Sequence, residues 1–441
     1  MRPRNLISCL KGQSRVCRRS PRPMTKILSG AFSIILVVAS LFALLAANVV
    51  PVSAQTLTTL WSFGSYIRGR GQDGSYPNGG LVLDPQGNLY GTTTTGGAHT
   101  FGTVFKVSPS GTETILYNLH GIASGPVAGL LRDQSGNLYG TTADTRSYGY
   151  KGCEGIGAVF ELAPSGKETV LHRFSQWKKK PPDVYCPVAS LIFDAQGNLY
   201  STALDGGNYK YCYGSGCGGV FRVTQSGSEK LLYTFNGGSD GAYPGAPLIF
   251  DAEGNLYGTT SEGGTTSCNP PYGCGTVFKL TPSGTETVLY RFGGADGNSP
   301  AGLVFDAEGN LYGTTFYGGI TSDCSGYQPG CGVVFELTPS GMETVLYSFT
   351  GGADGAYPSG GLIFDSEGNL YGATQNGGAY GCGVIFELSP SGTETVLYSF
   401  TGGDDGAVPN GPLVFDSQGN LYGTTLYGGA KLVGTVFKLA P

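Results

Sequence analysis

One four-residue string, Gly-Asn-Leu-Tyr, constrains the fold of this chain more than any other feature, because it occurs seven times. The copies begin at Gly87, Gly136, Gly197, Gly254, Gly309, Gly368 and Gly419, with spacings from 49 to 61 residues. Self-similarity with a period of this length is typical of repeat architectures, in which each copy forms one supersecondary unit. The chain is therefore predicted to consist of seven copies of one unit.

Each copy contains four short segments rich in the residues that strands favour. In the sixth copy these segments are residues 361–365, 369–374, 384–388 and 395–400. Asp-x-x-Gly-Asn separates the first two segments and Ser/Thr-Pro-Ser-Gly the last two, and both motifs supply the residues of tight hairpins. The other two connections are long and variable, so we expect them to lie together on the opposite face. Four-stranded repeats of this length predict the blades of a β-propeller.

The two ends of the chain share one repeat between them. Residues 57–63 read as a fourth strand alone, whereas residues 413–416, 420–425 and 436–439 read as the first three strands without a fourth. Joining these parts would complete a sheet and remove its exposed edge. The sequence therefore predicts an all-β, seven-bladed β-propeller with four-stranded blades, closed by pairing of the N-terminal strand with the three C-terminal strands. A β-solenoid and a propeller with another blade phase are the alternatives.

The repeat as a whole resembles a known family. Asp-x-x-Gly-Asn-Leu-Tyr-Gly-Thr-Thr, Gly-x-Val-Phe-Lys/Glu-Leu and Gly-x-Glu-Thr-Val-Leu-Tyr-Ser-Phe are similar to the GloVer-type tandem repeat of secreted bacterial choice-of-anchor proteins. The resemblance covers essentially all of residues 57–441. It implies an exported bacterial repeat protein, and it implies no activity.

The N-terminal 54 residues are predicted to be a signal peptide rather than part of the fold. A basic leader without acidic residues precedes an apolar run at residues 27–47, and Val52-Ser53-Ala54 matches a signal-peptidase site. Met24 would be a more usual start. An uncleaved signal anchor is the alternative, since about 20 apolar residues can span a bilayer. Residues 55–441 then form a single propeller domain that is secreted, periplasmic or on the cell surface.

Charge argues against two classes of partner. The chain has 26 basic and 31 acidic residues, and eight of the basic residues lie in the leader. The remaining negative surface disfavours nucleic acid and anionic membranes. We therefore expect no nucleic-acid partner and, after signal cleavage, no membrane insertion. A monomer is expected.

Cysteines recur in the connections between the second and third strands. We expect disulfides Cys212–Cys217, Cys268–Cys274 and Cys324–Cys331, with Cys153–Cys186 as a candidate fourth and Cys382 left over. Metal ligation is the alternative, but there is no Cys-x-x-Cys and there are few histidines, so no metal site is predicted.

A second acidic motif, Asp-Gly-x-x-Pro, precedes several first strands. Its aspartates are Asp73, Asp240, Asp296, Asp354 and Asp405. One interpretation is turn formation. The other is that several carboxylates converge near the central channel and bind a hydroxylated ligand or calcium, which needs six to eight oxygen ligands. No other cofactor is expected.

Aromatic side chains in the long connections are the other candidate ligand-binding residues. Copies two and three depart most from the repeat and contain Tyr148, Tyr150, Trp177, Tyr185, Tyr209, Tyr211 and Tyr213. Variation on one face of a regular scaffold often marks a binding surface, and such rings suit sugars and peptides. Ordinary loop packing is the alternative.

Catalytic motifs are absent from the sequence. Its three histidines, His99, His120 and His172, occupy unrelated positions in the repeat, and there is no Gly-x-Ser-x-Gly elbow. The sequence thus predicts an extracytoplasmic binding or scaffold protein that recognises a glycan, a peptide or a cell-surface protein through its long-loop face. The alternative is a secreted polysaccharide hydrolase or lyase with acids at the channel mouth, because two carboxylates from separate loops leave no local motif.

Overall fold

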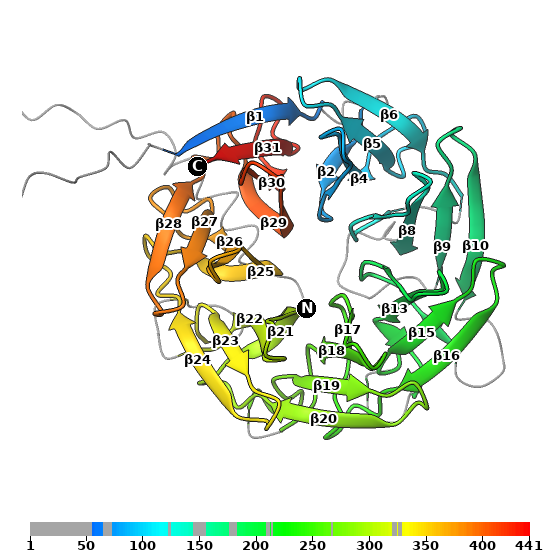
Figure 1. Cartoon of the computed structure of the whole chain (residues 1–441), viewed down its shortest axis with the longest axis vertical. Helices are drawn as coiled ribbons and strands as arrows, with labels where there is room; N and C mark the ends of the chain where they lie inside the picture. Colours follow the sequence, from blue (N-terminus) through cyan, green and yellow to red (C-terminus); the bar gives the residue numbers. More distant parts are fainter. Residues whose placement is uncertain are drawn as a thin grey trace, which may run out of the picture.

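The chain folds into a closed ring of seven antiparallel sheets. The computed structural model describes residues 55–64, 73–121, 125–143, 156–175, 183–208, 212, 215–265, 268–319, 324 and 329–441. Figure 1 shows the sheets arranged around a central axis, with one strand of each sheet nearest the axis and one at the periphery. The predicted seven-bladed propeller is confirmed. The predicted signal peptide lies outside the described residues.

Within each blade, four strands follow one another from the axis outward. The innermost strands are β3 (Val82–Leu83), β7 (Leu131–Arg132), β12 (Ile192–Phe193), β17 (Ile249–Phe250), β21 (Asn298–Phe305), β25 (Ala356–Phe364) and β29 (Ala407–Phe415). The second strands are β4 (Leu89–Thr95), β8 (Leu138–Ala143), β13 (Leu199–Ala203), β18 (Leu256–Thr260), β22 (Leu311–Tyr317), β26 (Leu370–Asn376) and β30 (Leu421–Tyr427).

The outer half of each blade has the same regularity. The third strands are β5 (Thr103–Val107), β9 (Ile156–Leu162), β15 (Gly219–Val223), β19 (Thr276–Leu280), β23 (Val333–Leu337), β27 (Val384–Leu388) and β31 (Thr435–Ala440). The outermost strands are β6 (Glu113–Asn118), β10 (Glu168–Ser175), β16 (Glu229–Thr234), β20 (Glu286–Arg291), β24 (Glu343–Ser348), β28 (Glu394–Ser399) and β1 (Thr56–Ser62). Three short strands lie outside this four-strand pattern: β2 (Ser75–Pro77), β11 (Val184–Tyr185) and β14 (Asp205–Gly206). β2 pairs with β4, and β11 pairs with β14. We number the blades 1 to 7 from β3 to β29.

Blade 7 closes the ring. β1 pairs antiparallel with β31 from Thr56–Ala440 to Ser62–Thr435, which places the first described strand beside the last (Figure 1). The Thr424 hydroxyl in blade 7 also donates to the Gly79 carbonyl beside the first inner strand. Closure therefore uses both the outer edge of the sheet and the wall of the channel.

Phenylalanines hold neighbouring blades together. A Phe at the end of an outermost strand, or directly after it, packs edge-to-face on the third-strand Phe of the next blade at six interfaces, with ring centroids 4.8 to 5.3 Å apart. All these rings are fully buried. Such pairs contribute roughly 0.5–1.5 kcal/mol beyond area burial. The second strand must leave room for the ring, since a Cβ at Gly372 would lie 2.6 Å from Cζ of Phe386.

Candidate functional site

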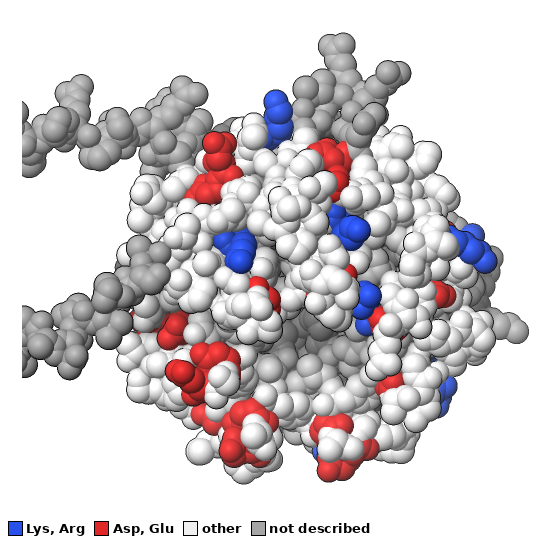
Figure 2. Space-filling view, turned by 45° about the horizontal axis from the view of Figure 1, so that its top comes forward, with Lys and Arg blue, Asp and Glu red and all other residues white. Residues whose placement is uncertain are grey.

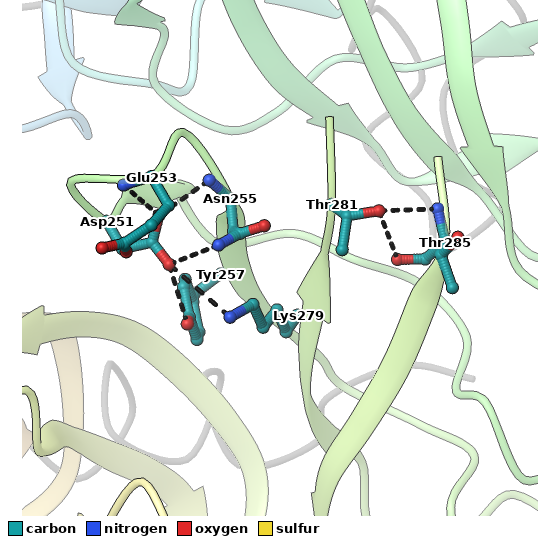
Figure 3. A network of polar contacts seen from close by, with 7 residues as sticks. All are labelled: Asp251, Glu253, Asn255, Tyr257, Lys279, Thr281 and Thr285. Atoms are coloured by element: carbon teal, nitrogen blue, oxygen red, sulfur yellow. Dashed lines mark hydrogen bonds and ion pairs between the residues drawn. The ribbon is translucent and has the colours of Figure 1, made fainter. Parts of the chain in front are cut away.

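The tight-turn end of each blade carries one repeated polar cluster, shown for blade 4 in Figure 3. Asp251 Oδ1 accepts hydrogen bonds from the backbone N–H groups of Glu253 and Asn255, at 3.1 and 2.8 Å. Asp251 Oδ2 accepts from Asn255 Nδ2 at 2.7 Å and from the Tyr257 hydroxyl at 3.0 Å. Lys279 Nζ lies 3.6 Å from the same oxygen. We call this cluster of Asp, Asn and Tyr the turn clasp.

The turn clasp is a structural unit of every blade. The Asn side chain donates to the Asp in all seven copies. Burial alone would raise the pKa of these carboxyl groups, but hydrogen bonds from the Asn side chain and backbone and from the Tyr hydroxyl outweigh it and lower the pKa. The affected residues are Asp84, Asp194, Asp251, Asp306, Asp365 and Asp416.

The aspartates of Asp-Gly-x-x-Pro do not converge on the channel, which corrects that interpretation. In blade 4 the Asp296 carboxylate accepts from the Tyr290 hydroxyl at 2.6 Å and from Gly293 N–H at 2.8 Å. The others make similar bonds next to the outermost strand of their own blade; these are Asp73, Asp240, Asp354 and Asp405. None of the five lines the axial cavity described below. Each loop curls back on the outermost strand, because the carboxylate satisfies nearby donors.

Glutamates from the neighbouring blade face these aspartates. Glu343, which begins β24, accepts from the Tyr290 hydroxyl at 3.3 Å, so that one phenol contacts two carboxyl groups. Burial, with repulsion from Asp296 added, raises the pKa of Glu343 to about 7, although the Tyr290 hydrogen bond opposes this rise. Glu113, Glu286 and Glu394 begin other outermost strands and have their pKa raised to about 7, chiefly by burial. We call these groups the interblade carboxyls.

Disulfides lie at the long-loop end, as predicted. The structure contains Cys212–Cys217, Cys268–Cys274 and Cys324–Cys331. Cys186 is also disulfide-bonded, whereas its predicted partner Cys153 lies outside the described residues. Cys382 is the described cysteine outside a disulfide, and its buried thiol lies 3.5 Å from the Tyr380 carbonyl. It occupies the place of the second cysteine of each pair, in a shorter connection.

The second cysteine of each pair positions the next blade. The Cys331 carbonyl accepts a hydrogen bond from Tyr357 N–H at 2.8 Å, and Cys274, Cys217 and Cys382 do the same for Ser299, Tyr243 and Val408. The donors Tyr243, Ser299, Tyr357 and Val408 each precede a proline, and their own φ is positive, between 56° and 59°. Tyr76 and Cys186, which also precede a proline, have φ of 59° and 69°. Positive φ at non-glycine residues is strained and often accompanies functional sites. Of these residues, Tyr243 and Ser299 line the axial cavity described below.

A cavity of about 400 Å³ lies on the axis of the ring. Its wall is made mainly of the segments that follow these prolines, which are rich in Gly, Ala and Ser. Among the described residues that line it there is no Asp, Glu, Lys, Arg or His. Figure 2 shows a central hollow in one face of the ring, with charged residues in small groups between large uncharged areas. The cavity is thus built for uncharged groups.

The described wall of the cavity contains both amide and aromatic groups. On its amide side Gln375 of blade 6 donates to Asn410 of blade 7 at 2.9 Å, and Asn410 Nδ2 donates to Asn78 of blade 1. The wall also contains Tyr243 and Phe316, from blades 4 and 5. Phe316 stacks on Tyr357 of blade 6 with ring centroids 5.2 Å apart, and Tyr357 lies in β25, which pairs with the strand that carries Gln375. Aromatic rings therefore adjoin the amide side.

Sequence reasoning missed this cavity, because its residues vary between copies at positions after the conserved proline. Among the predicted aromatics, Tyr185 is 4% exposed and its hydroxyl donates to the Ser215 carbonyl at 2.6 Å. Tyr185 is therefore a packing residue of the β11–β14 pair. The other predicted aromatics, Tyr148, Tyr150, Trp177, Tyr209, Tyr211 and Tyr213, lie outside the described residues.

Metal-ligating clusters and membrane-spanning helices also bear on the class of site. Among the described residues, no group of three or more His, Cys, Asp or Glu is arranged to hold a metal ion. The described part of the chain also has no helix of the length and apolarity needed to span a bilayer.

The fold and cavity define the class: a closed seven-bladed β-propeller with an uncharged axial pocket. The chain belongs to the Gloeobacter/Verrucomicrobia repeat family, whose model matches residues 50–269 and 264–441. This match confirms the resemblance seen in the sequence. No curated protein matches the chain by sequence.

Solved structures show the same kind of fold at low identity. Two structures of the extracellular domain of BT4673 from B. thetaiotaomicron match with TM-scores of 0.50 and 0.51 and 10% identity. That protein is described as a one-component system in the first case and as a hybrid two-component system in the second. The match covers 87% of this chain but only 40% and 39% of those chains, so this chain spans less than half of their length.

Proposed function

We propose that this protein is an extracytoplasmic binding protein that takes a neutral glycan or peptide into the axial cavity from the long-loop face. The observation that carries the proposal is that the described wall of the cavity combines an amide side, with Gln375, Asn410 and Asn78, with the aromatic residues Tyr243 and Phe316. A volume of about 400 Å³ lies within the ordinary range for small-molecule pockets.

Sugars and peptides suit such a cavity for a physical reason. A sugar ring has an apolar face of C–H groups, which pack on Tyr or Phe, and hydroxyl groups, which bond to amides. The side chain of Gln375 keeps an acceptor and a second N–H beyond its bond to Asn410, whereas Asn410, whose Nδ2 donates to Asn78, keeps acceptor capacity at Oδ1. A charged ligand would be desolvated in this cavity without a partner, which is costly.

Export is supported by independent features. Disulfides form and persist in oxidising compartments, and this chain has several at its long-loop end. The basic and apolar leader points the same way. A part of the extracellular domain of BT4673, 40% and 39% of the two matched chains, has a similar fold, which is in keeping with this location.

Glycan and peptide arrays probed with the exported protein test the proposal, followed by calorimetry of any ligand found. We expect Phe316→Ala and Gln375→Leu each to weaken binding about tenfold or more, because one removes the stacking face and the other an amide. Met342→Ala is the matched control, since Met342 is 62% exposed in a tight turn at the other end of the blade. Equal binding by all three variants would exclude the axial cavity as the site.

The described wall of the cavity contributes no carboxyl group, so the hydrolase or lyase alternative gains no support from it. Incubation of the array ligand with the protein should release no shorter product. Product release would replace the binding proposal with the enzymatic one.

A further inference from the structure

A second cavity, of about 490 Å³, lies between blades 1 and 2 at the tight-turn end. Tyr90 and Lys106 of blade 1 form part of its wall, and Arg132 of β7 faces them from blade 2. Ser135 and Ser165, from the two tight turns of blade 2, complete its polar lining. We call this cavity the blade 1–2 cleft. It is distinct from the axial cavity and shares no residue with it.

The cleft exists where the repeat is broken. At five other interfaces the Tyr of Gly-Asn-Leu-Tyr packs edge-to-face on a Phe that ends the innermost strand of the next blade, with centroids 5.0 to 5.3 Å apart. Arg132 takes the place of that Phe opposite Tyr90. Its guanidinium carbon lies 5.9 Å from the centre of the Tyr90 ring. A cation therefore occupies the position that elsewhere seals the interface with an aromatic ring.

The two cations of the cleft have no acidic partner in the part of the chain that the structure describes. Lys279, in the same register of blade 4, forms an ion pair with its turn-clasp aspartate, but Lys106 forms none among the described residues. The nearest clasp acids, Asp84 and Asp133, are occupied by hydrogen bonds within their own turns. Two positive charges thus face one cleft in a chain whose formal charge is −5.

Arg132 also retains unused hydrogen-bonding capacity. Its Nε is buried without a hydrogen-bond partner, and Nη1 makes only a long bond, of 3.5 Å, to the Asp133 carbonyl. A buried donor without a partner is costly, so native structures usually satisfy it. A guanidinium offers five N–H donors in a planar fork that matches a carboxylate or sulfate in two-point contact.

We propose that the blade 1–2 cleft binds the anionic group of an acidic glycan, with Arg132 and Lys106 as its charged contacts. The Tyr90 ring supplies a surface for the sugar, and Ser135 and Ser165 supply hydroxyl groups beside the anion. The cleft volume is sufficient for a small oligosaccharide segment by the usual range for ligand pockets. Arg132 is half-buried, and its partial burial beside the lysine strengthens attraction for an anion relative to a fully exposed site.

Calorimetric titration of the full mature protein with a uronic-acid trisaccharide tests this proposal. Its carboxyl-reduced, neutral counterpart is the ligand control, and inorganic sulfate and phosphate are separate arms. We expect the uronate to bind with an affinity that falls as salt rises, and the neutral trisaccharide to bind at least about tenfold more weakly. Tighter binding of sulfate or phosphate than of the uronate would overturn the assignment to an acidic sugar. Equal binding of the charged and neutral trisaccharides would overturn the anion site.

Variants locate the site. Arg132→Phe restores the residue used at five other interfaces, and Lys106→Gln removes the second cation. We expect each to lower uronate affinity about tenfold or more. Lys438→Gln is the matched control, because Lys438 holds the same register beside Tyr422 in blade 7 and lies outside the cleft. Thermal melting shows whether each variant is folded. Unchanged affinity in folded Arg132→Phe would exclude the cleft, whatever happens at the axial cavity.

Discussion

The inner tight turns and the interfaces between outermost strands both pair a Tyr hydroxyl with carboxyl groups, but to opposite effect. In the turn clasp of blade 6, Asp365 accepts bonds from Glu367 N–H, from Asn369 N–H and Nδ2, and from the Tyr371 hydroxyl. At the interface of blades 4 and 5, by contrast, one hydroxyl on Tyr290 faces both Asp296 and Glu343. The clasp supplies several donors to one acid, whereas at the interface two acids share one phenol, and only Asp296 has a further donor, the Gly293 N–H.

The number of donors decides which protonation state is favoured. At Asp365 the hydrogen bonds outweigh burial and lower the pKa. At Glu343 burial and the adjacent Asp296 outweigh one shared hydroxyl, and the pKa rises to about 7. Residue type alone therefore does not set the titration of a repeated carboxyl group, because its local donors do.

The largest effect is expected from removal of a clasp carboxylate. Asp365→Ala leaves two backbone N–H groups, the Asn369 amide and the Tyr371 hydroxyl without their acceptor. We expect the free energy of unfolding to fall by about 3 kcal/mol, as for loss of a charged hydrogen-bonding partner. Urea titration measures it. Glu367→Ala is the control, since only its backbone contacts Asp365. A loss equal to that of the control would show that the clasp is not stabilising.

A smaller loss of stability is expected when a long-loop disulfide is removed. Replacing both Cys324 and Cys331 by alanine should lower the free energy of unfolding by about 2 kcal/mol, on the chain-entropy model for so short a loop. Cys382→Ala, in the blade that lacks a disulfide, should cost about 1 kcal/mol through lost packing alone. Guanidinium unfolding without reductant measures both. A double variant as stable as the parent would mean that the loop is held by its backbone bonds.

The smallest effect on stability is expected at an interblade carboxyl, and its size depends on pH. Because the pKa of Glu343 is raised above its ordinary 4.5, the folded state holds the proton more tightly than the unfolded state. Its contribution is therefore most favourable below pH 4.5 and is lost as the pH rises to about 7. Glu343→Gln should stabilise the protein at pH 8 by about 1 kcal/mol after allowance for solvent screening, and should change little at pH 4.5.

Melting temperatures from pH 3 to 9 measure this dependence. The clasp aspartates act in the other direction, since their lowered pKa makes their stabilisation disappear as the pH falls below their ordinary value of 3.8. Stability should therefore be greatest between about pH 4 and 5 and fall toward neutrality. Maximum stability at pH 8, or a Glu343→Gln variant destabilised equally at every pH, would contradict this account.

The sequence by itself determined the ring. Seven copies of Asp-x-x-Gly-Asn-Leu-Tyr set the blades and their hairpins, because the turn chemistry is local, and the split repeat required β1 to pair with β31. The short disulfides were also predictable, since their cysteines are close in the chain. Features whose residues all lie within one copy of the repeat can be predicted from that copy alone.

Only the tertiary structure decided what lies between blades. The amide side of Gln375, Asn410 and Asn78, the contact of Tyr290 with Glu343, and the meeting of Lys106 with Arg132 each join residues of different copies. Each of these contacts involves a departure from the repeat or crosses an interface between blades, so no local motif predicts it. For the Asp-Gly-x-x-Pro acids the sequence left turn formation and convergence on the channel both open for the same reason, because the donors that they bind lie beside the outermost strand.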